Sequence, residues 1–467
     1  MKHFNDEAGV TAVKSPYTLD ASHSWLAVIL LAAMFAMSYI DRLIMAVLAN
    51  PVAQSLHLSD TQIGLLSGSS FAVLYSLACL PAAQFIDTNN RKQIVLIGVT
   101  LWSAMTIASC FAVDLASLMV ARSGVALGEA VLVPGAVSMI GDLFVKERRT
   151  LPTAVFSSMA PAMGTGSFMI GGAVLGVAGL IAPHGWEPWR LTFIIVGVPG
   201  LLLALAFLLL VKEPVHVRQN VELADDVSFL GFFKYLRQHY WFYFPLMLSH
   251  AALSFFAFAL LSWAPTLLIR AHGFQPAAAS FIFGLVIMPS SLAAIYFWPW
   301  LAARVERKHL HRGVPTGLFA AALLALPSFV LAPLMTNKYL FIGGLCFAHM
   351  AMAASGVLPN LGFQIFSPGR MRGRASALFS LIGNLVGYGL GPVLTVYFGH
   401  LWKGPATLAG WDIAANPLAR GLAIDGMIAA PIMVVCTAIC LRTARRLPVV
   451  EPAGILELSP FVQANSE

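Results

Sequence analysis

Four ionisable side chains interrupt stretches of sequence that are otherwise apolar. Asp41 and Arg42 lie within residues 24–50, and Arg122 and Glu129 lie within residues 115–139. A charge at bilayer depth is costly unless it is paired or faces water, so ionisable residues there are candidates for function. Two acids and two bases together predict a place where a charged ligand and a proton are both bound. The competing interpretation is a static ion-pair network that joins the two segments.

The composition of the chain indicates that a membrane surrounds these charges. Of the 467 residues, 58% are hydrophobic and only 10% are charged, against about 25% charged residues in soluble domains. The apolar runs are long and continuous, which favours transmembrane helices over a β-barrel. The five cysteines lie in such runs without metal-ligand spacing, so we expect packing roles, no metal site and no cofactor.

Twelve apolar runs predict an all-α integral membrane fold with twelve transmembrane helices. The runs are approximately 24–49, 61–86, 93–113, 116–143, 150–181, 190–211, 241–269, 277–303, 314–335, 339–366, 374–400 and 418–441. A charged segment separates the sixth run from the seventh and predicts a linker with a short amphipathic helix from Phe229 to Tyr235. The predicted parts are a tail (1–23), a six-helix bundle (24–211), the linker (212–240), a second six-helix bundle (241–441) and a tail (442–467).

Basic residues cluster in the loops that follow even-numbered runs, and the positive-inside rule then places both termini in the cytoplasm. An internal repeat supports two equivalent halves. Arg91 and Lys92 lie 216 residues before Arg307 and Lys308. Two halves in parallel orientation are typical of carriers that bind their substrate at the interface between the halves.

The segment from Ala83 to Lys92 is similar to the loop signature of the major facilitator superfamily. Asp87, Arg91 and Lys92 match that signature, whereas Ala83 and Thr88 depart from its usual glycine and arginine. Three further segments resemble the spinster branch, namely Tyr39–Arg42, Gly128–Ala130 and Asp142–Arg149. The anion:cation symporter branch shares the acid–base pair of the first helix and the Arg-x6-Glu pattern of the fourth. The resemblance implies two pseudo-symmetric six-helix halves and transport by alternating access.

The charged quartet lies within roughly 11 Å of depth at 1.5 Å per helical residue, so we expect each arginine to pair with an acid. The spacing does not decide which acid pairs with which arginine. We favour Glu129 as the proton carrier, with Asp41 as a close second. We expect no equivalent charges in the second half.

The candidate residues fall into two further groups. The candidates for substrate binding are Arg42, Arg122, Tyr39, Tyr75, His250, Trp263, Asn360, Asn384 and Tyr388. The candidates for gating, implied by the resemblance, are Asp87, Arg91, Lys92, Asp142 and Arg149. Packing or helix bridging is an equally good interpretation for each polar residue of the second half.

The predicted function is proton-coupled secondary transport of a small organic or amphipathic anion. The alternative within transport is efflux of drugs or lysolipid and sphingolipid-like substrates by proton antiport. A membrane-embedded enzyme is disfavoured, because no nucleophile–base set, metal cluster or nucleotide loop is present. A membrane-embedded sensor is disfavoured, because we expect the linker and the C-terminal tail to be too short for an added cytoplasmic domain. The expected partners are the substrate, protons and the lipid bilayer, without nucleic acid. We expect a monomer in the cell membrane, which in a bacterium is the inner membrane.

Overall fold

The computed structural model describes residues 21–145, 148–213, 229–309, 311–366, 372–402, 407–408, 411–412 and 415–446. Within these residues, twelve helical spans are long and apolar enough to cross a membrane. The predicted all-α membrane fold is therefore confirmed. A hairpin of two-residue strands, β1 (Thr407–Leu408) and β2 (Trp411–Asp412), lies between the last two long helices.

The helices form two groups. The N-terminal half consists of α1 (Ala21–Ser55), α2 (Asp60–Gly64), η1 (Leu65–Ser69), α3 (Ser70–Thr88), α4 (Arg91–Ala108), η2 (Ser109–Phe111), α5 (Leu115–Glu129), α6 (Leu132–Leu143), α7 (Thr150–Ile181) and α8 (Pro188–Leu210). The C-terminal half consists of α10 (Tyr240–Arg270), α11 (Pro276–Glu306), α12 (Gly313–Leu334), α13 (Lys338–Phe366), α14 (Arg372–Leu401), α15 (Pro417–Thr443) and η5 (Ala444–Arg446). The predicted amphipathic helix is α9 (Phe229–Gln238), which extends three residues beyond Tyr235. The domain boundaries at 212–240 stay a prediction.

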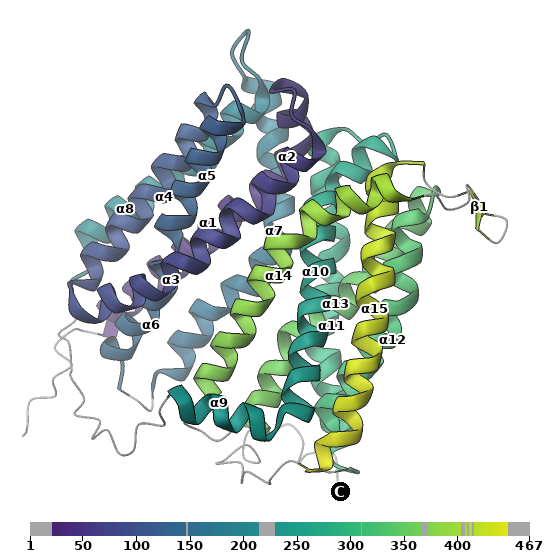
Figure 1. Cartoon of the computed structure of the whole chain (residues 1–467). Coiled ribbons are helices and arrows are strands. Elements are labelled where there is room, and N and C mark those ends of the chain that lie inside the picture. Colours follow the sequence, from purple (N-terminus) through teal and green to yellow (C-terminus); the bar gives the residue numbers. More distant parts are fainter. Residues whose placement is uncertain are drawn as a thin grey trace, which may run out of the picture.

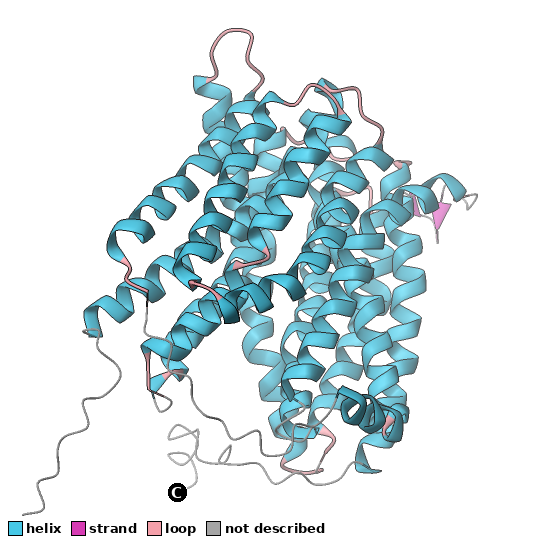
Figure 2. Cartoon of the chain, turned by 60° about the vertical axis from the view of Figure 1, so that its left-hand side comes forward, coloured by secondary structure: helices cyan, strands magenta, loops and turns pink. Residues whose placement is uncertain are grey.

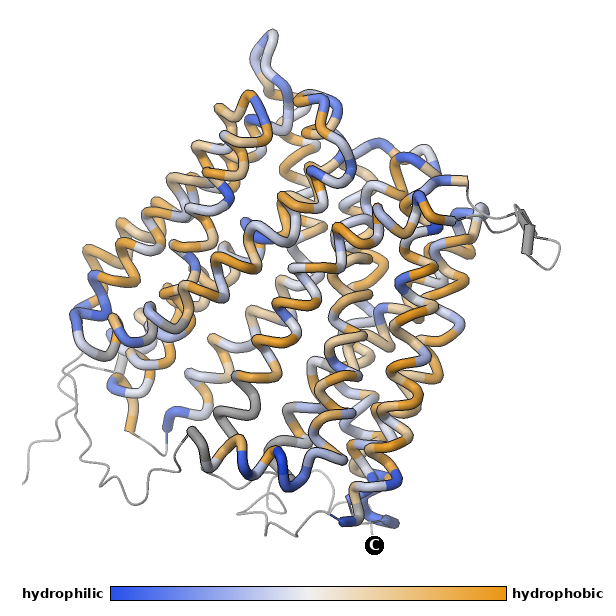
Figure 3. The backbone as a smooth tube through the Cα atoms, in the orientation of Figure 1, coloured by the Kyte–Doolittle hydropathy of each residue, from blue (hydrophilic) through white to orange (hydrophobic). Residues whose placement is uncertain are grey.

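Short polar segments start the helices and turn the chain. Ser59 caps α2 through a capping box with Gln62, and Asp114 caps α5 in the same way with Ser117. Such caps satisfy backbone N–H groups that have no partner inside the helix. Figure 3 shows hydrophobic colour along the helices and hydrophilic colour mainly toward their ends. The apolar stretches of the long helices therefore lie between polar ends, as expected of helices that cross a bilayer.

Two of the predicted spans are interrupted in their interior. In the second span, residues Leu65–Ser69 form a π-helical turn between α2 and α3, a distortion that is frequent at functional sites. The fourth span breaks between Glu129 and Leu132. Pro134 explains this break, because it has no N–H to donate to the carbonyl of Ala130 four residues earlier.

The two halves contact each other on one side of the bundle. We call the side that holds Ala21 and Arg446 the terminal side, and the opposite side the distal side. Figures 1 and 2 show the ribbons of the two halves converging toward the distal side and spreading apart toward α9. On the distal side, the Arg270 guanidinium donates to both Asp60 carboxylate oxygens at 2.8 and 2.9 Å and to the Asn50 amide oxygen at 2.9 Å. These bonds join α1 and α2 to the end of α10.

Glycines allow the two backbones to approach closely there. A Cβ atom on Gly68 would lie 2.2 Å from the Tyr388 carbonyl oxygen, and one on Gly172 would lie 2.5 Å from the Phe281 backbone nitrogen. The Tyr388 carbonyl is left without its helical donor because Pro392 has no N–H. Backbone-to-backbone packing at η1–α14 and at α7–α11 therefore closes the distal side.

Candidate functional site

Helices α1 and α5 position the charged quartet. Arg122 and Glu129 are seven residues apart, so they share one face of α5. Glu129 is the last residue of α5, directly before the break caused by Pro134. The quartet is therefore built from the middle of one long helix and the end of an interrupted one.

Arg42 and Glu129 form a buried ion pair. The Arg42 Nη2 atom donates to Glu129 Oε2 at 2.7 Å, and Arg42 Nε donates to the same oxygen at 3.2 Å. The Glu129 side chain is fully buried, and the Arg42 side chain is 10% exposed. The other carboxylate oxygen, Oε1, has no hydrogen-bond partner. One oxygen of Glu129 thus holds the arginine while the other is left without a donor.

Three aromatic rings surround the Arg42 guanidinium. Its Cζ atom lies 5.2 Å from the centroid of Tyr39, 5.0 Å from that of Phe71 and 4.7 Å from that of Tyr75. Ring faces at such distances attract a cation. The structure thus brings together Arg42, Tyr39 and Tyr75 from the predicted set, and it adds Phe71, which sequence reasoning missed because a lone Phe in an apolar run carries no signal.

Arg122 and Asp41 are buried without forming an ion pair. The Arg122 Nη1 atom donates to the Asp41 backbone carbonyl at 2.9 Å, and Nη2 lies 3.5 Å from the Arg42 carbonyl. The Asp41 Oδ1 atom has no hydrogen-bond partner. The expectation that each arginine pairs with an acid is correct for Arg42 and wrong for Arg122. Adjacent helical residues point about 100° apart, so Arg42 can reach Glu129 while Arg122 spans the backbone of α1.

Tyr388 brings the C-terminal half to this site. Its ring is buried and lies 6.4 Å from Phe71 and 3.6 Å from Phe258, measured between ring centroids. Asn384, one turn earlier on α14, is partly buried. The Asn360 side chain lies outside the described residues. A continuous row of rings therefore leads from Arg42 across the interface to α10.

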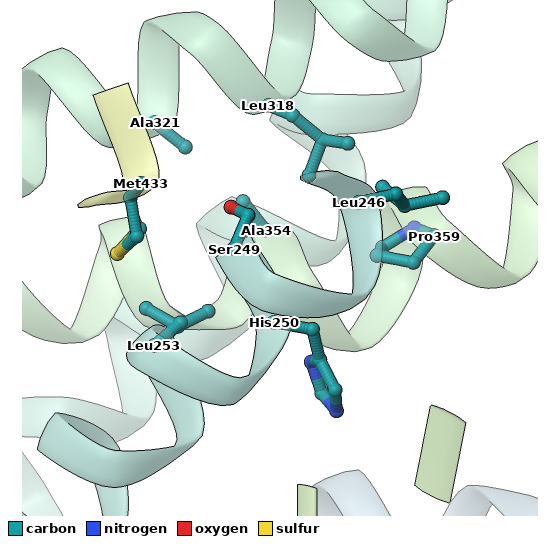
Figure 4. Close-up of a pocket in the computed structure, with 9 residues that line it drawn as sticks. All are labelled: Leu246, Ser249, His250, Leu253, Leu318, Ala321, Ala354, Pro359 and Met433. Carbon is teal, nitrogen blue, oxygen red and sulfur yellow. The ribbon is translucent and has the colours of Figure 1, made fainter. Parts of the chain in front are cut away.

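His250 and Trp263 on α10 make contacts within the C-terminal half. The Trp263 Nε1 atom donates to the Pro392 carbonyl at 2.8 Å, so its N–H is already used. The His250 ring stacks on Phe379 at 3.4 Å and lines a cavity of about 10 Å³ (Figure 4). A cavity of that size holds one water molecule at most. Substrate contact by His250 and Trp263 stays a prediction.

Three of the predicted gating residues, Arg91, Lys92 and Asp142, form a cluster with Glu213 inside the N-terminal half, on the terminal side. Arg91 is buried and pairs with Asp142 and, through Nε at 2.9 Å, with Glu213. The backbone N–H of Lys92 donates to Glu213 at 2.7 Å, and Lys92 Nζ donates to the Leu208 carbonyl at 2.8 Å. These contacts join α4, α6 and the end of α8. Sequence reasoning missed Glu213, because it assigned that residue to a linker.

Arg149, another predicted gating residue, makes its recorded contact outside this cluster. Arg149 Nε donates to the Phe144 carbonyl at 2.8 Å, within its own loop. The Asp87 side chain lies outside the described residues. The gating role of both residues stays a prediction.

A third buried acid, Asp425, lies in the C-terminal half, so the expectation that this half holds no equivalent charge is wrong. Asp425 on α15 is 0% exposed and contacts Thr395 at 2.5 Å. It lies inside the twelfth predicted run, so the rule that selected Asp41 also applies to it.

His349, also buried, contacts Ser291 at 2.6 Å. No group of three or more His, Cys, Asp or Glu side chains is placed to hold a metal ion among the described residues.

On the distal side, Glu187 ties the end of α1 to the start of α8. Its Oε2 atom accepts from Ser55 at 2.6 Å, Trp189 at 3.0 Å and Arg190 at 3.1 Å. Burial raises the pKa of Glu187, but the hydrogen bonds from Ser55, Arg190 and Trp189 outweigh it and hold the pKa below its ordinary value. The ionised carboxylate is therefore the form that this contact stabilises.

Comparison with known proteins is consistent with this architecture. An MFS-type efflux pump of Mycolicibacterium smegmatis is 28% identical over 373 residues, which cover 79% of this chain and 83% of the pump. Human protein spinster homolog 3 is 26% identical, with 81% of this chain and 76% of that protein covered. A crystal structure of a bacterial homologue of the human lysosomal transporter Spinster, inward-facing and unoccupied, matches the fold with a TM-score of 0.75 at 24% identity, over 92% of this chain and 98% of that one.

The family model of the Major Facilitator Superfamily matches residues 28–392. This family consists of membrane transporters rather than enzymes. Because the match covers most of the twelve spans and includes the whole charged quartet, the chain belongs to the Major Facilitator Superfamily and is a transporter that resembles the spinster proteins.

Proposed function

We propose that this transporter moves a small organic or amphipathic anion together with a proton and that the Arg42–Glu129 pair is the exchange point. The observation that carries the proposal is the buried pair itself: Glu129 binds Arg42 through one oxygen and has no donor on the other. A buried ion pair contributes little to stability compared with apolar packing. A role in transport accounts for its presence better than a structural role.

The charges of the pair account for the coupling. In the empty site, the cation Arg42 and the anion Glu129 neutralise each other. A bound anion competes for Arg42, and Glu129 is then left as a buried carboxylate without its cation. Such a carboxylate takes up a proton, because burial disfavours its charged form. One monoanion and one proton enter together, so the net charge of the site does not change.

Arg122 and Asp41 provide a second base and a second acid beside this pair. Arg122 is bonded to backbone carbonyls rather than to a carboxylate. It is therefore able to bind a second oxygen of the anion without first breaking an ion pair. Asp41, buried beside it, is the second candidate for the proton.

The rings around the pair support an amphipathic substrate. Tyr39, Phe71 and Tyr75 flank Arg42 in the N-terminal half, and Tyr388 and Phe258 continue the row in the C-terminal half. An anionic head at Arg42 would place an apolar or aromatic body against these rings. Mostly apolar pockets with a few polar groups are typical of small-molecule sites.

The direction of access follows from the closed distal side. The positive-inside rule places the terminal side in the cytoplasm. The contacts of Arg270, Gly68 and Gly172 lie on the opposite side. We therefore propose that this conformation is open toward the cytoplasm, with both termini cytoplasmic and the chain in the cell membrane.

Proton antiport is the second candidate, and the similarity to the mycobacterial efflux pump favours it. In that case a substrate and a proton would compete for Glu129 instead of binding together. The two candidates differ in the direction of proton movement that a substrate gradient causes.

The test is transport in proteoliposomes with an imposed pH gradient, using a panel of organic anions and lysolipids. For one proton per monoanion, the anion should accumulate about tenfold per pH unit, since one unit is worth about 1.36 kcal/mol. Glu129→Gln should lose this accumulation but keep exchange of anion between equal pools, because exchange needs no net proton movement. Asp114→Asn is the matched control, since Asp114 is an exposed helix cap and Asn caps helices equally well.

Each outcome decides between defined alternatives. Normal accumulation by Glu129→Gln would eliminate Glu129 as the carrier, and Asp41→Asn would then be tested in its place. Proton movement opposite to the substrate would establish antiport. Transport of a substrate without any proton movement would refute both forms of coupling and leave a uniporter.

A further inference from the structure

The buried acid of the C-terminal half has an unusual set of partners. Asp425 Oδ2 lies 2.5 Å from the Thr395 hydroxyl oxygen, and both residues are 0% exposed. The other oxygen, Oδ1, has no hydrogen-bond partner. In the described part of the chain, Thr395 is the one polar side chain recorded in contact with Asp425.

The number of hydrogens at this contact indicates the protonation state of Asp425. The Thr395 hydroxyl oxygen also lies 2.9 Å from the Gly391 carbonyl oxygen. A hydroxyl group has one hydrogen, so it can donate to only one of these two oxygens. If it donates to Gly391, the hydrogen between Thr395 and Asp425 must belong to a carboxylic acid.

The ionised alternative leaves more groups unsatisfied. If Asp425 were a carboxylate, the Thr395 hydrogen would turn to it, and the oxygens of Thr395 and Gly391 would face each other without a hydrogen. The buried Oδ1 would then carry charge without a donor, which is costly in an apolar interior. The neutral acid satisfies both short contacts.

Within the described residues, no cation is recorded in contact with Asp425. The ionisable residues of the helices packed against it are Tyr240, Tyr243, His250 and Arg270 on α10, Arg372, Arg374, Tyr388, Tyr397 and His400 on α14, and Arg420, Cys436, Cys440 and Arg442 on α15. The side chains of Arg372 and Arg374 lie outside the described residues. Helix α12 carries none between Gly313 and Leu334. None of these side chains is recorded in contact with Asp425 in the part of the chain that the structure describes.

Asp425 lies behind the segment of α14 that closes the distal side. Thr395 is one turn beyond Gly391 and Pro392, and the Pro392 carbonyl oxygen lies 3.0 Å from where a Cβ on Gly64 would stand. On the other side, a Cβ on Gly421 would lie 1.9 Å from the Thr395 carbonyl oxygen. Helix α14 therefore packs against the N-terminal half on one side and against α15 on the other. The Asp425–Thr395 contact is part of the packing between α14 and α15.

We propose that Asp425 is a second proton-binding site, occupied as a neutral carboxylic acid while the distal side is closed, and that its proton stabilises α14 in the closing position. Only its use during transport rests on the proposed proton coupling at Glu129. If the closed state binds this proton more tightly than the open state, protonation must favour closure in return. The ratio of closed to open molecules should then fall as the pH rises, by at most about tenfold per pH unit for one proton.

Infrared spectroscopy of the reconstituted full chain tests the protonation state directly. The wild type should show a carboxylic-acid carbonyl band that is absent in Asp425→Asn and retained in Glu129→Gln. Thr395→Val should shift this band, because it removes the hydroxyl that accepts from the acid. Thr437→Val is the matched control: Thr437 is also buried and bonds to the carbonyl four residues earlier, Met433, but faces no carboxyl group.

Distances between spin labels on the distal side test the consequence. Labels at the exposed positions His184 and Thr336 should report more open molecules at higher pH in the wild type and no pH dependence of this kind in Asp425→Asn. An unchanged acid band in Asp425→Asn would overturn the assignment, and an equal pH dependence in wild type and Asp425→Asn would overturn the support of α14. Loss of proton-coupled transport in Glu129→Gln does not affect either readout, so failure of the proposed function is distinguishable.

Discussion

Replacement of Gly68 by alanine should shift the protein away from the distal-closed conformation. The new Cβ would lie 2.2 Å from the Tyr388 carbonyl oxygen and 3.0 Å from Pro392 Cγ. An ordinary C···O contact is about 3.4 Å, so η1 and α14 must separate by about 1.2 Å. Overpacking of this kind costs about 1–3 kcal/mol. Because the cost applies only to the closed state, the ratio of open to closed molecules should rise about 5- to 150-fold.

The assay is the distance distribution between spin labels at His184 and Thr336, measured in a cysteine-free background. Gly164→Ala is the control, because Gly164 also lies in a span but has no atom within 4 Å of the added Cβ. Both substitutions raise helix propensity by a similar amount, so this contribution cancels. An identical distance distribution for Gly68→Ala and Gly164→Ala would refute the argument that backbone contact at Gly68 closes the distal side.

Two further predictions concern ion pairs outside the exchange site. Arg91→Met should destabilise the N-terminal half by about 3 kcal/mol, because it leaves the carboxylate of Glu213 without its cation. The change should be seen as a lower Tm in detergent, whereas the control Arg148→Met, at an exposed residue, should leave the Tm unchanged. Equal Tm values for the two variants would contradict a stabilising role of the Arg91 cluster. Although burial raises the pKa of Glu187, hydrogen bonds such as that from Ser55 hold this pKa below its ordinary value. Ionised Glu187 therefore stabilises the fold at any pH above the ordinary pKa of a glutamate. This stabilisation is lost as the pH falls through the lowered pKa. Glu187→Gln should therefore lower the Tm at neutral pH and approach the wild type in acid, whereas a difference that grows in acid would contradict the pKa direction.

Hydropathy and charge placement were sufficient to predict the fold class. Span number depends on local composition, because each span must satisfy its own backbone hydrogen bonds within the bilayer. The same local rule identified Asp41, Arg42, Arg122 and Glu129 as residues that need a special reason to be buried. It applies equally to Asp425, which lies inside the apolar run 418–441.

The partners of these charges required the three-dimensional structure. Whether Arg42 or Arg122 reaches Glu129 depends on how α1 and α5 are rotated and on the break after Glu129, and neither follows from spacing along one helix. Glu213 joins Arg91 only because the end of α8 returns to the start of α4. Contacts between residues distant in sequence depend on how whole helices pack, so local sequence does not encode them.

The conformational state of the transporter also required the three-dimensional structure. The sequence around Gly68 is the same whether the distal side is open or closed. In the structure, a Cβ atom on Gly68 would lie only 2.2 Å from the Tyr388 carbonyl oxygen of the other half, which shows that the distal side is closed. Local sequence thus determined which residues are buried in the membrane, because burial depends on each segment's own hydropathy. Tertiary structure alone decided which of them meet, because that depends on the relative position of two halves that a transporter must be able to change.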